Sequence, residues 1–191
     1  MNISQSPEIL YERATPLAGK FSVRAFDLEK DLATIHRWVN LPYAQYWGLL
    51  DSSPEKVRAT YQEILESGTK VFIGESEGKQ KFLMEQYDCI RELNGHYEGK
   101  NGDTGMHILV GPPDEKIPGY TWAVFSTVMD FLFSDPNVKR VVVEPDVRNE
   151  KIHVLNKKAG FKYLKQIVLP HKTAWLAVCE REDFFNGQMW Q

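Results

Sequence analysis

The stretch from Val141 to Phe161 constrains the fold of this chain more than any other. Three valines are followed by EPDVRNEKIHVLNKKAGF over residues 144–161, so an apolar strand runs through a short turn into a helix. Pro145 favours extended backbone before it, and Gly160 supplies the left-handed residue that commonly ends a helix. Phe161 then opens another apolar run. Strand, helix and strand in this order predict an α/β layer with Asp146 at the exit of a strand.

The remaining sequence alternates between the same two kinds of pattern. Apolar residues at helical spacing predict helices at 27–39, from Ser53-Pro54 onward, at 119–133 and at about 148–159. Strand-like runs occupy 20–25, 70–74, 80–88, 105–110, 138–144, 161–169 and 173–179, with hairpin turns at 75–79 and 170–171. We expect one mixed α/β domain over residues 1–191, with residues 1–19 as a partly irregular N-terminal extension.

Charge and composition exclude several classes of protein. The 191 residues carry a net charge of −3, which provides no overall attraction to nucleic acid or anionic lipid, so any phosphate binding must be local. The N-terminus lacks the pattern of a secretory signal, and no apolar run reaches the ~18 residues of a membrane span. Cys89 and Cys179 form no metal or disulfide pattern. We expect a cytoplasmic protein without metal, nucleic-acid or membrane partners.

Residues 116–121, KIPGYT, lie between a predicted strand and a predicted helix. A loop that opens a helix presents free backbone N–H groups and the positive end of the helix dipole, which together bind anions. Lys116 adds a positive charge, and Gly119 allows close approach of the backbone. Pro118 removes one N–H donor, a loss that the first turn of a helix tolerates. This segment is a candidate phosphate-binding loop.

Both segments resemble the GNAT acyltransferases. The resemblance lies in the run N-x-x-A-x-x-L-Y-x-K-x-G-F, matched here from Asn149 to Phe161, and in the pyrophosphate loop [RQ]-x-x-G-x-[GA], matched by residues 116–121. It implies a mixed, mostly antiparallel sheet flanked by helices and acyl-CoA as co-substrate. Asn156 stands where many members carry a tyrosine that can protonate the departing thiolate. The acyl-CoA contacts it implies are Val110, Lys116, Gly119, Tyr120, Thr121, Arg148, Asn149 and Asn156.

Three further patterns resemble the siderophore-biosynthesis branch of that superfamily. They are G-D-x-G-x-H-x-L from Gly102, E-P-D-x-R-N from Glu144 and L-P-x-K-x-A-x-L from Leu169. Members of the aerobactin, alcaligin, rhizobactin and mycobactin type transfer an acyl group to the hydroxylated nitrogen of lysine or an aliphatic diamine. The resemblance covers about residues 28–184 and implies His107 and Asp146 as the catalytic candidates.

The expected chemistry leaves the roles of these two residues open. A hydroxylamine nitrogen already carries its lone pair, so the base needs only to take a proton as the C–N bond forms. His107 is our candidate general base, with Asp146 orienting it or binding a substrate hydroxyl or ammonium, and the reverse assignment is also open. Alternatively, His107 is a core histidine, and Asp146 caps the following helix, a role that Asn149 could also fill.

Two further residues are candidates for substrate binding. Trp47, in the aromatic cluster 43–47, would line the acyl or alkyl-amine pocket, with core packing as the alternative. Glu85, on the strand before that of His107, could receive a substrate ammonium. We expect acetyl- or succinyl-CoA as donor, a small N-hydroxyamine as acceptor, and a monomer or homodimer. The alternatives are a GNAT enzyme that acts on plain amines and a non-catalytic acyl-CoA sensor.

Overall fold

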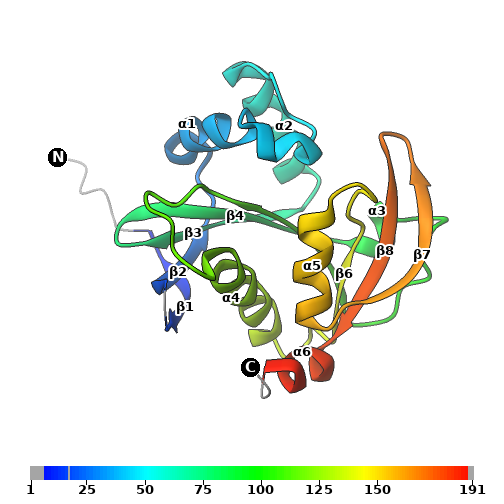
Figure 1. Cartoon of the computed structure of the whole chain (residues 1–191). Helices are drawn as coiled ribbons and strands as arrows, with labels where there is room; N and C mark the ends of the chain where they lie inside the picture. Colours follow the sequence, from blue (N-terminus) through cyan, green and yellow to red (C-terminus); the bar gives the residue numbers. More distant parts are fainter. Residues whose placement is uncertain (1–6, 17, 189–191) are drawn as a thin grey trace. The chain divides into compact units, whose positions relative to one another are not determined.

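The computed structural model describes residues 7–16 and 18–188 (Figure 1). The chain divides into two compact units, one of Met1–Met84 with Ile108–Val124 and the other of Glu85–His107 with Phe125–Gln191. Three elements begin in one unit and end in the other: strand β4 (Lys79–Tyr87), strand β5 (Asp103–Val110) and helix α4 (Tyr120–Ser134).

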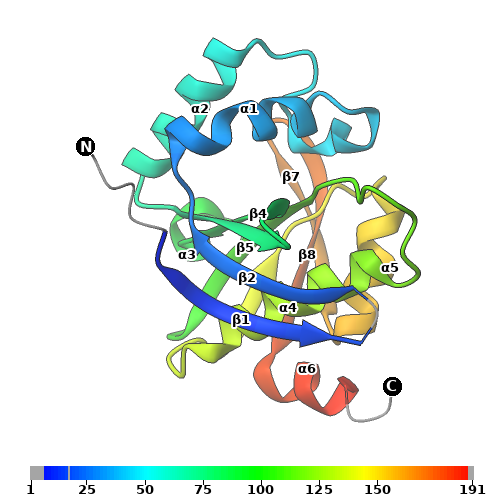
Figure 2. The same ribbon diagram turned by 90° about the vertical axis from the view of Figure 1, so that its left-hand side faces the viewer.

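The first unit begins with an antiparallel pair of strands, β1 (Ile9–Thr15) and β2 (Gly19–Ala25), which lie side by side in Figure 2. Strand β1 lies within the N-terminal segment 1–19, in which the sequence indicated no strand. None of the seven β1 side chains is buried, and its sequence ILYERAT does not alternate apolar and polar residues as a half-buried strand does. Strand β3 (Lys70–Ser76) pairs with the other edge of β2.

Helices α1 (Leu28–Val39) and α2 (Pro54–Glu66) follow the predicted spans, with the 3₁₀ helix η1 (Pro42–Trp47) between them. Asp27 caps α1 by accepting from two backbone N–H groups, and Ser53 caps α2. The apolar faces of both helices enter one core with β3 and β4. Its buried members include Ile35, Trp38, Val57, Tyr61, Ile73 and Leu83.

The predicted hairpin turn between β3 and β4 is confirmed. Glu77 and Gly78 both adopt positive φ, 52° and 71°, as a two-residue hairpin loop of primed type requires. This turn places Glu75 and Gln80 on adjoining strands, where both contribute to a buried polar network.

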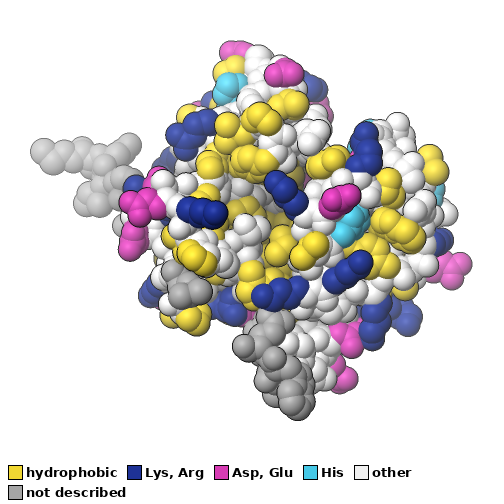
Figure 3. Space-filling model, in the orientation of Figure 1, with side chains coloured by type: hydrophobic (Ala, Val, Ile, Leu, Met, Phe, Trp, Pro, Cys, Tyr) yellow, Lys and Arg dark blue, Asp and Glu magenta, His cyan; other side chains and the backbone are white. Residues whose placement is uncertain are grey.

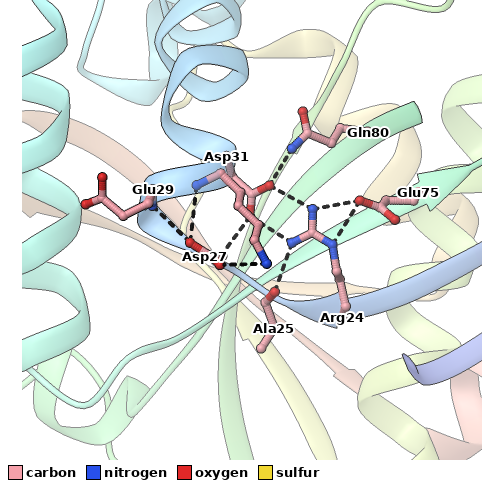
Figure 4. Close-up of polar contacts among 8 residues, drawn as sticks. Arg24, Ala25, Asp27, Glu29, Asp31, Glu75 and Gln80 are labelled. Carbon is pink, nitrogen blue, oxygen red and sulfur yellow. Dashed lines mark hydrogen bonds and ion pairs between the residues drawn. The ribbon is translucent and has the colours of Figure 1, made fainter. Parts of the chain in front are cut away.

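The network centres on Arg24 of β2 and Asp31 of α1 (Figure 4). Two guanidinium nitrogens of Arg24 donate to the Asp31 carboxylate at 2.8 and 2.7 Å, and Glu75 of β3 accepts from Arg24 at 2.6 Å. Gln80 donates to Asp31 as well. Because Arg24 and Asp31 are 5% and 0% exposed, each charge depends on the other for compensation.

The second unit contains strands β6 (Arg140–Val143), β7 (Lys162–Leu169) and β8 (Lys172–Glu180). Its helices are α3 (Cys89–Glu92), α5 (Glu150–Ala159) and α6 (Arg181–Gln188). Residues 103–105 of β5 pair in parallel with 140–142 of β6, and β8 pairs antiparallel with both β6 and β7. The predicted terminal hairpin with its turn at residues 170–171 is confirmed, whereas α3 and α6 were not predicted.

Helix α5 starts and ends as its sequence indicates. Asn149 caps it by accepting from the Ile152 N–H group, and Gly160 ends it with φ of 95°. A Cβ atom at Gly160 would lie 3.1 Å from the Asp183 carbonyl oxygen, a second reason for glycine there. The alternative in which Asp146 caps this helix is therefore wrong.

Over the described residues, the strands form one mixed, mostly antiparallel sheet of eight in the order β1-β2-β3-β4-β5-β6-β8-β7. The predicted α/β fold class is confirmed. No helix in residues 7–16 and 18–188 is long and apolar enough to cross a bilayer. On the face drawn in Figure 3, Lys and Arg side chains are scattered among acidic and apolar ones, as the small net charge suggests.

Candidate active site

The second unit places His107 between two carboxylates. Its Nδ1 lies 3.0 Å from Glu85 of β4, and its Nε2 lies 2.6 Å from Glu144, the residue that directly follows β6. An ionised carboxylate only accepts hydrogen bonds, so a ring that serves both must carry a proton on each nitrogen. Burial alone would lower the pKa of His107, but the charges and hydrogen bonds of Glu144 and Glu85 outweigh it and raise the pKa to about 10. His107 is therefore an imidazolium at neutral pH.

Glu144 is the centre of this cluster. One of its oxygens accepts from His107 and lies 3.4 Å from the Lys172 ammonium, and the other accepts from the Tyr87 hydroxyl. Burial favours the neutral acid, but the positive charges of His107 and Lys172 lower the pKa of Glu144 to about 2. Burial and the charge of Glu144 hold the pKa of Tyr87 well above its ordinary value, so the phenol keeps its proton. The Tyr87 ring lies over that of His107, with centroids 4.5 Å apart.

Asp146, two residues beyond Glu144, holds a different partner. Its carboxylate accepts from Arg148 Nε at 2.9 Å, from Arg148 Nη2 at 2.7 Å and from the Arg148 backbone N–H at 2.9 Å. Arg148 outweighs burial and lowers the pKa of Asp146 to about 2. The Asp146 side chain is 5% exposed and that of Arg148 is 71% exposed, so the cation can leave towards solvent. The ring-orienting role predicted for Asp146 is filled by Glu85 and Glu144.

Three of the five residues of this cluster, Tyr87, Glu144 and Lys172, were not predicted from the sequence. Tyr87 and Lys172 come from strands far apart in the chain, and only the fold brings both to Glu144. A signal for two of the missed residues was present, because Glu144 opens the pattern E-P-D and Lys172 is the lysine of L-P-x-K. Glu85 was predicted as an ammonium receptor, and the structure places it on the His107 ring.

The candidate phosphate loop lies in the first unit, before α4. Lys116, Gly119 and Thr121 are exposed, and Gly119 has φ of 74° with open space where a Cβ would be. The first N–H groups of any helix have no acceptor within the helix. Here the first bond of helical spacing runs from the Ala123 N–H group to the Gly119 carbonyl, at 2.9 Å. The segment therefore offers the backbone geometry that an anion needs.

The other predicted contacts have defined partners within their own units. The Val110 carbonyl accepts from Tyr43 at 2.8 Å, and the Tyr120 hydroxyl donates to the Lys81 carbonyl at 3.4 Å. Trp47 packs against the first core and donates to the Tyr61 hydroxyl at 3.1 Å, which favours the packing role.

Asn156 is 1% exposed, and its Nδ2 donates to the Tyr163 hydroxyl at 3.3 Å. Its Oδ1 has no hydrogen-bond partner within the described residues, so it retains the capacity to accept one further N–H group.

Comparison with known proteins identifies the family. The model of the acetyltransferase (GNAT) domain matches residues 27–169, which is most of the chain. This chain belongs to the GNAT family. It is 28% identical to N-hydroxyputrescine acetyltransferase of Acinetobacter baumannii, over 97% of this chain and 89% of the relative. It is 27% identical to N(6)-hydroxylysine O-acetyltransferase of Escherichia coli, over 93% of this chain but only 58% of the relative's length.

Solved structures agree with this assignment. A protein from Bacillus halodurans matches with a TM-score of 0.85 at 25% identity, covering 94% of each chain. The aminoglycoside acetyltransferase AAC(6')-Ib, solved with paromomycin and acetyl-CoA, has the same fold, with a TM-score of 0.75 at 20% identity over 86% of this chain and 96% of its own. The GNAT chain described here is an acyltransferase, and the predicted resemblance to the siderophore-biosynthesis branch is confirmed.

Proposed function

We propose that this protein transfers an acyl group from acetyl- or succinyl-CoA to the hydroxylated nitrogen of an N-hydroxy-diamine or N6-hydroxylysine. The product is a hydroxamate for siderophore biosynthesis. The observation that carries the proposal is the weak basicity of the cluster: His107 is already protonated, and Glu144 and Asp146 have pKa values of about 2. Such groups are poor at deprotonating an alkylammonium of pKa ~10, but they suit a nucleophile that is neutral at pH 7.

The reaction then proceeds by direct attack in a ternary complex. The nitrogen lone pair forms the C–N bond with the thioester carbon, and the C–S bond breaks. The proton that nitrogen loses passes to Asp146 once Arg148 has turned to solvent, and it ends on the CoA thiolate. His107 supplies a fixed positive charge near the oxygen on which negative charge develops. This is the reverse of the first assignment from the sequence, in which His107 was the base.

In this proposal acyl-CoA binds at the loop 116–121 that leads into α4 and at the start of α5. In the first unit, Lys116, Gly119, Tyr120 and Thr121 are the candidate contacts for the pyrophosphate, although the Tyr120 N–H group already donates to the Ile117 carbonyl at 3.2 Å. Arg148 and Asn149 at the start of α5 and the Asn156 Oδ1 are the candidate contacts in the second unit. A covalent acyl-cysteine is not part of the proposal, because burial raises the pKa of Cys89 and Cys179 to about 12 and leaves both thiols protonated.

The test is release of CoA thiol by the purified protein, with acetyl- and succinyl-CoA offered in turn. The acceptors are N-hydroxyputrescine, N-hydroxycadaverine, N6-hydroxylysine and their unhydroxylated parents. Turnover on the hydroxylated set, with a product that forms a coloured Fe(III) hydroxamate complex, would support the proposal. Turnover on the parents alone would indicate a plain-amine acetyltransferase. CoA binding without turnover on any acceptor would indicate a sensor.

A further inference from the structure

A chain of hydrogen bonds in the second unit ends on the main chain of Asp146. Asn156 Nδ2 lies 3.3 Å from the Tyr163 hydroxyl oxygen, which lies 2.7 Å from His153 Nδ1. His153 Nε2 in turn lies 3.0 Å from the Asp146 carbonyl oxygen. The chain crosses from α5 to β7 and back before it reaches the turn after β6.

The chemistry of the two ends sets the direction of every hydrogen bond. The Asp146 carbonyl can only accept, so His153 Nε2 must carry a proton. The Asn156 amide nitrogen can only donate, so the Tyr163 oxygen accepts from it and directs its own O–H towards His153 Nδ1. In a neutral ring that nitrogen is the acceptor, and the network therefore assigns His153 the Nε2–H tautomer.

The main chain around Asp146 is also held by backbone contacts. The Val147 N–H group, in the same peptide unit as the Asp146 carbonyl, donates to the Thr173 carbonyl at 3.0 Å, and the Pro145 carbonyl accepts from Trp175 at 2.9 Å. Asn149 N–H donates to the Asp146 carbonyl at 3.0 Å, and Asp146 makes an isolated bridge to Ala174 of β8. The segment 144–149 lies outside strand and helix, so its peptide planes are fixed by such individual contacts. His153 is the side-chain donor to this carbonyl, and without it the carbonyl keeps only the Asn149 N–H group, so the peptide can tilt about the remaining backbone contacts and shift the Asp146 carboxylate.

We propose that His153 and Tyr163 are positioning residues that act through the Asp146 carbonyl and aim its carboxylate at the substrate nitrogen. Tyr163 selects the His153 tautomer, and His153 adds a side-chain hydrogen bond to the backbone contacts that orient the Asp146 peptide. This inference rests on the proposed function insofar as Asp146 takes part in acyl transfer. A reacting group displaced by about 1 Å can lose about 10²-fold in rate, so small rotations at Asp146 would be measurable.

His153 and Tyr163 lie at a cavity, which makes both side chains suitable for substitution. His153 and Tyr163 line a cavity of about 510 Å³ together with Glu150, Val154, Lys157 and Trp175. Truncating a side chain that borders an existing cavity leaves little new buried void, so these variants are expected to fold.

The decisive pair of variants is His153→Gln and His153→Asn. The amide nitrogen of Gln reaches roughly the place of Nε2 and can still donate to Asp146, whereas the shorter Asn reaches only the place of Nδ1. We expect His153→Asn to lower kcat by about 10–100-fold, with KM for acyl-CoA within about twofold, and His153→Gln to recover most of the loss. Tyr163→Phe should give an intermediate loss. Lys157→Gln, on the same cavity, is the matched control and should keep full activity.

A second readout does not depend on turnover. In wild-type protein, ¹⁵N shifts of the His153 ring should show the Nε2–H tautomer, and Tyr163→Phe should give a mixture. The ¹³C signals of the Asp146 carbonyl and carboxyl should move in His153→Asn and stay in His153→Gln. An Nδ1–H tautomer, unmoved Asp146 signals or equal kcat for the two His153 variants would overturn the inference. A wild-type enzyme inactive on every hydroxylated acceptor would instead overturn the proposed function, and the ¹⁵N and ¹³C signals would still decide the inference.

Discussion

His107 holds its proton because a carboxylate accepts from each ring nitrogen, and this has a consequence for the pH dependence of catalysis. If the imidazolium is the active form, kcat/KM for a hydroxylated acceptor should fall as pH rises through about 10, the raised pKa of His107. His107 should contribute no acid-side limb near pH ~6.5, the ordinary pKa of histidine. The measurement is a kcat/KM profile from pH 6 to 10.5, with the acceptor's own protonation titrated separately.

Variants at the cluster test the same point. His107→Gln removes the fixed charge and should lower kcat by about 10²-fold, a typical size for one electrostatic contact in the transition state. Glu85→Gln leaves Glu144 as the only carboxylate on the ring and should move the alkaline limb to lower pH. A wild-type limb rising through pH ~6.5 that disappears in His107→Gln would instead show that neutral His107 acts as a base.

At the scale of single residues, the sequence identified those candidate site residues that lie inside short sequence patterns. His107 and Asp146 became candidates because the patterns G-D-x-G-x-H-x-L and E-P-D-x-R-N around them resemble those of the siderophore-biosynthesis branch. Their partners were assigned incorrectly, because Glu144 and Asp146 are only two residues apart and the sequence does not show which carboxylate meets the ring. Tyr87 illustrates the limit, since nothing near it in sequence indicates a hydrogen bond to a residue 57 positions away.

At the scale of elements, Asn149 combines two roles that mutation can separate. It caps α5, and it is a candidate contact for acyl-CoA. Asn149→Ala should reduce the free energy of unfolding by about 1 kcal/mol, whereas Asn149→Ser should restore the cap and most of the stability. If the side chain also binds acyl-CoA, both variants should raise KM for the donor. Urea unfolding and donor KM, measured on the same preparations, distinguish a cap alone from a cap that binds.

The Arg24 network links β2, α1 and β3, and its loss should be costly. Asp31→Ala would leave the buried guanidinium of Arg24 with Glu75 as its remaining carboxylate, and we expect about 3 kcal/mol of destabilisation. Glu29→Gln, on the same helix as Asp31, breaks the exposed ion pair with Arg58 of α2 and should leave the free energy of unfolding nearly unchanged. Chemical unfolding of both variants checks this, and equal stabilities would contradict a structural role for the buried pair.

Elements with a regular apolar face were predictable, and the others were not. Helices α1, α2 and α4 combine buried apolar residues with a capping or turn residue, and α5 combines the half-buried Ile152 and Leu155 with the Asn149 cap and Gly160, so local sequence was sufficient. Strand β1 exposes or half-exposes every side chain, and α6 buries Phe184 in a segment with weak helical periodicity. Phe184 packs against Phe133, which is distant in sequence, and β1 is held by pairing with the neighbouring strand β2, so neither element needs a regular apolar face of its own.

At the scale of the whole molecule, the GNAT relatives of this chain are named for different acceptors, an aminoglycoside in one and N-hydroxyputrescine in another. AAC(6')-Ib, an aminoglycoside acetyltransferase, shares the architecture at 20% identity, so the fold alone does not choose the acceptor. The choice must depend on side chains at the site. Here the protonated His107 and the ionised Glu144 and Asp146 provide a strong field but little basicity.

This distinction predicts how the two kinds of acceptor respond to pH. At pH 7 only about one in a thousand molecules of an amine with pKa ~10 is neutral, and that fraction rises tenfold per pH unit. An enzyme that cannot deprotonate the amine should therefore show kcat/KM for putrescine rising about tenfold per unit between pH 7 and 9. The value for N-hydroxyputrescine should stay nearly flat over the same range, because its nitrogen is already neutral. Parallel profiles for the two acceptors would show that the protein itself removes the ammonium proton, and the weak-base argument for a hydroxylated acceptor would fail.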